Sequence, residues 1–224
     1  VVSALLAEVI VRGLPASLPV GLAVALIIGF GYSAATIVLL RPTLKFDVSL
    51  SSIRDLTMLL AIAVASAAVV AIVYVGMFAS AGLVPWRDFG AAVLRYWVGD
   101  VIGIAVMTPF LLILLTRGRP FPVTLQTVLQ IAAIGLGLVV VFASAQSRQF
   151  QLFYVLFLPI IWIAVRSGLE GVSAGLVLTQ LGLIVALQIA PPSDVDVTAF
   201  QVLMLVLTMT GLATGMLVTE RQRA

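Results

Sequence analysis

The sequence contains no cysteine and no histidine, and charged residues make up only 9% of its 224 residues. Without thiols the chain cannot form disulfides or bind metals through cysteine, and without imidazole it lacks the usual ligand of haem and metal ions. An ordinary soluble domain carries about 25% charged residues, so the polar side chains here are too few to cover a water-facing globule. Soluble, redox and metal-dependent functions are therefore disfavoured, and we expect no cofactor, no metal and no catalytic residue.

Long apolar runs are what the sequence has instead, and hydrophobic residues make up 62% of it. In a bilayer every backbone N–H and C=O must be satisfied within the protein, which leaves helices or a closed barrel as membrane-spanning structures. Barrel strands would alternate apolar and polar residues over about ten positions, whereas the runs here are unbroken. The sequence predicts an all-α fold, a polytopic transmembrane helix bundle that forms one integral membrane domain over residues 1–224.

Apolar runs bounded by Arg, Pro, Gly and polar clusters predict seven full spans preceded by a truncated one. They lie near residues 1–11 (truncated), 20–40, 56–80, 91–115, 124–144, 150–165, 171–190 and 198–218. Neither an initiator methionine nor a charged segment precedes the first run, so we expect the domain to be truncated at its N-terminus rather than to begin with a signal peptide.

The twelve Lys and Arg residues are distributed unequally between the two sides of this bundle. One side holds Arg41, Lys45, Arg54, Arg117, Arg119, Arg166, Arg221 and Arg223, and the other holds Arg12, Arg87, Arg95 and Arg148. Positive residues favour the cytoplasmic side, which predicts a multi-pass protein of the bacterial cytoplasmic (inner) membrane with a cytoplasmic C-terminus. Because these cations are scattered among loops, the net charge of +3 does not indicate nucleic-acid binding.

Asp100 is the clearest candidate for a functional residue, because it lies well inside the fourth predicted span. An ionisable group in hydrocarbon costs several kcal/mol and is therefore a default functional candidate. Tyr96 lies one turn before it and Trp97 three residues before it. Gly99 and Gly103 flank the aspartate with the G-x-x-x-G spacing of closely packed helices.

Two interpretations of Asp100 stay open. In the first, it forms a polar ligand or ion site in the outer half of the bundle. In the second, it forms a polar clasp between helices with Arg95 or Tyr96, and Arg95 can alternatively extend to the interface as an anchor.

Other residues on the predicted helices favour structural roles. Pro109 lies inside its span and should bend the helix. Trp162 and Arg166 are four residues apart, which allows a cation–π contact worth about 0.5–2 kcal/mol or two separate interfacial anchors.

Two further pairs of glycines have the spacing of close helix packing, Gly171 with Gly175 and Gly211 with Gly215. The sequence contains no phosphate-binding loop, no nucleophile–base pair and no zinc-ligand spacing. These patterns therefore indicate a bundle rather than an enzyme.

Two motifs resemble the first class of bacterial membrane-associated sensor domains (MASE-type). The run R-Y-W-V-G-D-V-I-G-I-A-V-M-T-P from Arg95 to Pro109 carries the W-x-G-D-x-x-G segment of that family, and F-L-P-I-I-W-I-A-V-R-S-G from Phe157 to Gly168 carries its L-P-x-x-x-W-x-A-x-R-x-G segment. Residues 39–42 and 46–55 resemble its second cytoplasmic connection. The likeness covers nearly the whole chain, except that the family's first apolar segments with their W-P-P-x-G-type signature are missing.

The resemblance implies a sensory input module that is not itself an enzyme. It would relay a signal through the last helix to a histidine kinase of a two-component system or to a diguanylate cyclase, in an output domain expected after residue 224. The expected partners are the lipid bilayer, this output domain in the same chain, an unidentified small ligand and a second copy in a homodimer, with no nucleic acid. A small-molecule permease or the membrane subunit of a transporter is the alternative, and a purely structural anchor is a third.

Overall fold

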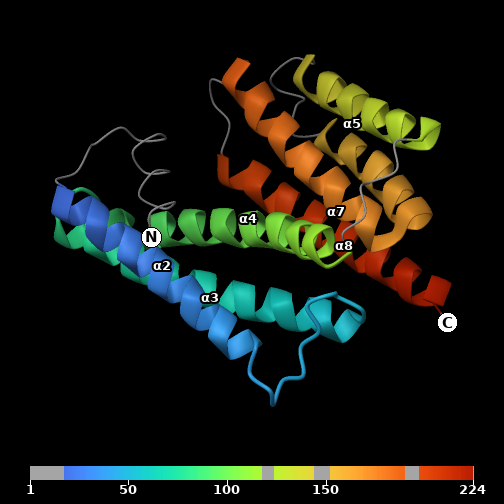
Figure 1. Ribbon diagram of the computed structural model, residues 1–224. Coiled ribbons are helices and arrows are strands. Elements are labelled where there is room, and N and C mark those ends of the chain that lie inside the picture. Colours follow the sequence, from blue (N-terminus) through green and yellow to red (C-terminus); the bar gives the residue numbers. More distant parts are fainter. Residues whose placement is uncertain (1–17, 118–123, 144–151, 190–196, 224) are drawn as a thin grey trace. The chain divides into compact units, whose positions relative to one another are not determined.

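The computed structural model describes residues 18–117, 124–143, 152–189 and 197–223, and these residues contain helices and connecting turns but no strand. The α-helices are α2 (Leu18–Leu39), α3 (Ile53–Ser80), α4 (Phe89–Arg117), α5 (Leu125–Ala143), α7 (Phe157–Ile189) and α8 (Val197–Arg223). Two short 3₁₀ helices, η1 (Trp86–Asp88) and η2 (Phe153–Leu156), precede α4 and α7. The all-α prediction is confirmed for this part of the chain (Figure 1).

Side-chain caps mark where two of these helices begin. Ser52 Oγ accepts a hydrogen bond from Asp55 N–H at 3.3 Å, just before α3. Thr124 Oγ1 accepts one from Thr127 N–H at 3.2 Å, and Thr127 Oγ1 accepts in return from Thr124 N–H at 3.3 Å. The first N–H groups of a helix have no acceptor within it, so these side chains define the starts of α3 and α5.

Six helices in the described residues are long and apolar enough to cross a membrane. The sequence predicts seven full spans and a truncated one, and two differences account for the lower number. The truncated run 1–11 lies outside the described residues. The described parts of the predicted spans 150–165 and 171–190 are joined in one helical stretch, which is apolar over Phe153–Gln188.

That stretch contains a reversal of the backbone at Gly168, where φ is 60° and ψ is −154°. A Cβ built on Gly175 would lie 3.2 Å from Ile163 Cδ1 and 3.5 Å from Ile160 Cδ1. In a straight helix, residues twelve positions apart would be separated by about 18 Å at about 1.5 Å per residue. The two halves of α7 therefore fold back and pack against each other, as Figure 1 shows. Because this combination of dihedral angles is open essentially only to glycine, Gly168 makes the reversal possible.

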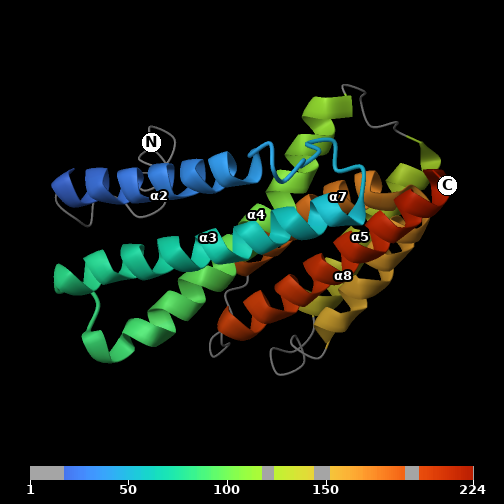
Figure 2. The ribbon, with the colours of Figure 1, turned by 90° about the horizontal axis from the view of Figure 1, so that it is seen from below.

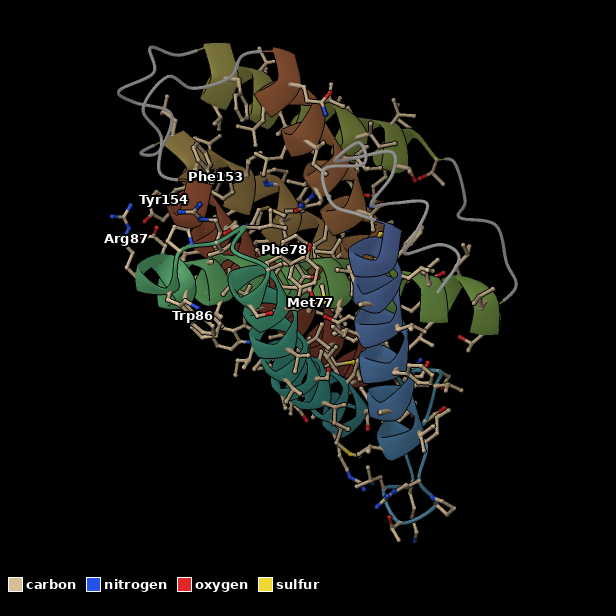
Figure 3. All side chains as sticks on the ribbon, turned by 90° about the vertical axis from the view of Figure 1, so that its left-hand side faces the viewer. Met77, Phe78, Trp86, Arg87, Phe153 and Tyr154 are labelled. Carbon is tan, nitrogen blue, oxygen red and sulfur yellow. The ribbon has the colours of Figure 1, made fainter. Side chains whose placement is uncertain are left out.

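The chain divides into two compact units, residues 1–46 with 58–101 and residues 47–57 with 102–224. In the first unit α2 runs beside α3, and a Cβ on Gly31 would collide with Val70 (Figure 2). Its buried centre is formed by Val24, Tyr74 and Val75. Figure 3 labels Met77 and Phe78 of α3, two of the partly buried apolar residues that surround this centre. The full set is Ile28, Met77, Phe78, Val84, Phe89, Ala92, Val93 and Tyr96.

In the second unit α8 packs closely on the second half of α7. A Cβ built on Gly215 would lie 3.1 Å from Leu169 Cα, and one built on Gly211 would lie 3.2 Å from Val172 Cγ2. Larger side chains at these positions would push the helices apart. The close packing predicted from the Gly211 and Gly215 spacing is confirmed.

Thr219 of α8 bonds to the backbone that the reversal leaves free. Leu169 N–H donates to Thr219 Oγ1 at 2.8 Å, and that hydroxyl donates in turn to Gly215 O at 2.8 Å. A buried N–H without an acceptor would destabilise the fold, so Thr219 stabilises the reversal and joins it to α8.

We expect Gly168→Ala to destabilise the protein by about 1–3 kcal/mol, because alanine is strained at this φ and its Cβ would collide with Thr219. Gly135→Ala is the matched control, because a Cβ there meets no atom within 4 Å and the residue lies in α5. Thermal unfolding of both variants in detergent would measure the difference. Equal Tm values for the two variants would contradict the assigned reversal.

Candidate functional site

Asp100 lies on α4, half-buried, in the first compact unit. Tyr32 of α2 donates a hydrogen bond through its hydroxyl to Asp100 Oδ2. A carboxyl group in an apolar environment needs such a partner, because burial without a hydrogen bond is costly. Tyr32 is thus the residue that satisfies Asp100, across 68 positions of sequence.

The aspartate's observed partner differs from those expected. Arg95 is exposed, and no ion pair joins it to Asp100 within the described part of the chain. The polar clasp of Asp100 is therefore made with Tyr32 rather than with Arg95. In the sequence, Tyr32 is a single polar side chain inside the predicted span 20–40. Nothing else in the pattern predicts that it pairs with Asp100.

Tyr96 belongs to a cluster of aromatic rings. Its ring stacks on Tyr74 of α3 with centroids 4.2 Å apart and an interplanar angle of 24°. Tyr74 in turn contacts Phe78, at 4.9 Å between centroids. Stacking of this kind adds to the energy of burial, so Tyr96 holds α4 against α3.

Trp97 makes a second link between α4 and α3. Its Nε1–H donates to Val64 O at 2.9 Å. Because a tryptophan N–H within an apolar unit needs an acceptor, this bond fixes both the rotamer of Trp97 and the register of the two helices. The motif residues Tyr96, Trp97 and Asp100 thus bind α4 to α2 and α3.

Of the remaining predicted residues, Gly99 belongs to the same unit as Asp100 and the others belong to the second unit. Gly99 is half-buried on the same helix. Gly103 is exposed and a Cβ on it would meet no atom within 4 Å, so no helix among the described residues approaches it closely. Pro109 lies buried inside α4, in the second unit.

Trp162 and Arg166 are on the first half of α7, in the second unit. Both side chains are exposed, Trp162 by 38%. The structure records no cation–π contact between them among the residues it describes. Separate interfacial anchors, the other interpretation of this pair, stay a prediction.

The comparison with protein families decides the class of the chain. A match to the MASE1 family extends over residues 1–222. The chain belongs to the MASE1 family of membrane-associated sensor domains. No curated protein and no solved structure matched it significantly.

The family and the apolar helices together establish the general role. MASE1 domains are sensory input domains of membrane proteins in signal transduction, and six helices here are apolar enough to cross a membrane. This region is therefore a multi-pass membrane sensor domain and not a catalytic one. Within the described residues of the MASE1 domain no group of three or more acidic side chains could hold a metal ion.

We expect Tyr32→Phe to destabilise the MASE1 domain by about 1–3 kcal/mol, because it removes the donor and leaves the Asp100 carboxyl group without its partner. Tyr154→Phe is the matched control, because that side chain is 58% exposed. Thermal unfolding of both variants in the same detergent provides the measurement. If Tyr32→Phe unfolds at the Tm of Tyr154→Phe, the hydrogen bond does not contribute to stability.

Proposed function

We propose that this MASE1 domain is the sensory input module of a bacterial signalling protein, and that its last helix relays a change to a cytoplasmic histidine kinase or diguanylate cyclase that follows residue 224. The observation that carries the proposal is the continuity of α8. This helix runs from Val197 through its apolar part into the charged end and remains helical to Arg223. A continuous helix can transmit a shift of one or two ångström between two packed arrangements.

The contacts of α8 support a specific topology. Glu220 Oε1 accepts a hydrogen bond from Ile53 N–H at 2.6 Å, and an Arg223 Nη donates to Ser51 O at 2.9 Å. The α2–α3 connection and the end of α8 therefore lie on one side of the membrane, so the chain crosses an even number of times between them. Counting α7 once gives five crossings, and counting its two halves separately gives six.

The position of the reversal favours two crossings by α7. Leu169, next to the reversal, is bonded to Thr219, which directly precedes Glu220. The reversal thus lies at the depth of the α8 end rather than in the middle of the bundle. Since this side carries most of the basic residues, it is assigned to the cytoplasm, with the C-terminus cytoplasmic and seven crossings from α2 to α8.

Single cysteines in this cysteine-free chain test the topology. Thr43→Cys and Arg166→Cys should be protected from an impermeant maleimide in intact cells and labelled after permeabilisation, whereas Asp88→Cys should be labelled in intact cells. All three positions are exposed in the structure. Labelling of Arg166→Cys in intact cells would contradict the double crossing of α7.

We infer that Asp100 is the sensory site, with Tyr32 as its partner. The other carboxyl groups among the described residues lie in a connection, near a helix end or, for Glu170, two residues after the reversal at Gly168. The full-length protein with Asp100→Asn should keep its yield, because an amide oxygen still accepts the Tyr32 hydrogen bond, but should change its output several-fold. Asp100→Leu removes the acceptor and should lower the folded yield as well. The exposed Asp88→Asn controls for loss of a charge, and wild-type output and yield in both Asp100 variants would contradict the proposed site.

The relay through α8 depends on helical phase. In the full-length protein, one alanine inserted after Arg223 rotates everything downstream by about 100°, whereas seven restore nearly the same face. Basal output activity in membranes should change several-fold with one inserted residue and return toward the wild-type level with seven. Wild-type activity in both proteins would overturn helix-borne transmission.

A further inference from the structure

The charged end of α8 is bound to the α2–α3 connection by two hydrogen bonds, both within the second compact unit. The Glu220 carboxylate meets Ile53 N–H, and the Arg223 guanidinium meets Ser51 O. Glu220 and Ile53 are 167 positions apart in sequence. This pair of bonds, here termed the exit clamp, consists of Ser51, Ile53, Glu220 and Arg223.

Glu220 provides a cap that α3 does not supply for itself. Ser52 and Asp55 form the local cap, in which Ser52 Oγ donates to Asp55 Oδ2 at 2.6 Å and accepts from Asp55 N–H. The N–H of Ile53, the first residue of α3, is left for another acceptor. A carboxylate at a helix N-terminus is favoured by the aligned peptide dipoles, so Glu220 both completes the cap and attaches α8 to it.

The connection that receives these bonds is itself well held. The Asp47 carboxylate accepts hydrogen bonds from Ser49 N–H at 2.9 Å and from Ser49 Oγ at 2.7 Å. Leu50 is completely buried. Hydrogen bonds from Ser51 and Ser49, with a further contribution from Arg223, lower the pKa of Asp47 to about 2, so it stays charged at neutral pH.

The clamp lies at the point where a signal would leave the membrane domain. One residue before Glu220, Thr219 binds the reversal of α7, so the last membrane-embedded turn of α8 is fixed to α7 and to the start of α3. The same helix α3 accepts the Trp97 hydrogen bond at Val64, close to the Asp100 motif on α4. α3 is therefore a continuous helix with one bonded point near the candidate site and another at the exit.

We propose that the exit clamp is a releasable latch: Glu220 and Arg223 hold α8 to the start of α3, and displacement of α3 is passed to α8 through these two bonds. This inference rests on the proposed relay through α8 and specifies its point of control. α8 cannot rotate or slide at the exit without breaking the cap on Ile53, and without the latch α8 moves independently of α3.

Two single changes break the same bond from opposite ends. Ile53→Pro deletes the N–H and leaves a residue that suits the first position of a helix, and Ile53→Ala is its control because it keeps the N–H. Glu220→Ala deletes the acceptor, and the exposed neighbour Arg221 supplies the control Arg221→Ala. Glu220→Gln keeps an oxygen acceptor but removes the charge. It is the milder variant that tests the latch if Ile53→Pro or Glu220→Ala fails to fold.

The latch is measured first without reference to output, in the full-length protein carrying Val48→Cys and Arg221→Cys with spin labels. Their distance distribution should be narrow in the parent protein and with Ile53→Ala. It should broaden with Ile53→Pro and with Glu220→Ala, and broaden no further when the two are combined. An unchanged distribution in Ile53→Pro and Glu220→Ala would overturn the latch.

Output activity is the second readout. Ile53→Pro and Glu220→Ala should each change basal output about fivefold or more, the double variant should match the single ones, and the two controls should stay at the parent level. If the distance distribution broadens but output is unchanged, the exit clamp does not regulate output. The alanine insertions after Arg223 then distinguish the relay through α8 from the latch. If output still depends on the helical phase of α8, the relay is supported and only the latch is rejected.

Discussion

The fold depends on one constraint, the need to satisfy every backbone polar group where no water is available. Helices meet this need along their length. Backbone groups without an intrahelical partner occur at the helix ends and at the reversal at Gly168. There Thr219 accepts the free N–H of Leu169, and the start of α3 uses Ser52 and Glu220 in the same way. Two of the bonds that join distant elements of this domain are thus bonds that a helix end or the reversal requires.

The sequence predicts well what depends on local pattern. Apolar runs predict the helices, and the four-residue spacing of Gly211 and Gly215 predicts the close packing of α8 on α7. The break between the predicted spans 150–165 and 171–190 coincides with the reversal at Gly168, although the two halves form one helical stretch. The family follows from the two motifs and is confirmed by the match over residues 1–222.

Contacts between residues far apart in the chain could not be predicted in this way. Asp100 is conspicuous in an apolar run, but its partner Tyr32 is an ordinary tyrosine of another helix, and Arg95 is closer in sequence yet does not pair with it. In the sequence, Glu220 is one of several charged residues after the last predicted span. Only the fold brings its carboxylate to the N–H of Ile53. Such pairings depend on which helices are neighbours and on their register, and helical periodicity determines neither.

We propose that the MASE1 domain controls an output domain after residue 224 instead of only anchoring it. The most direct measurement compares the full-length protein with a version in which an unrelated helical hairpin replaces residues 1–196. In that version α8 still crosses the membrane and still carries the attached domain. Kinase or cyclase activity would be assayed in membranes at equal amounts of protein. If the domain controls the output, basal activity should shift several-fold in the replaced version; equal activity in the two proteins would show that the domain serves as an anchor.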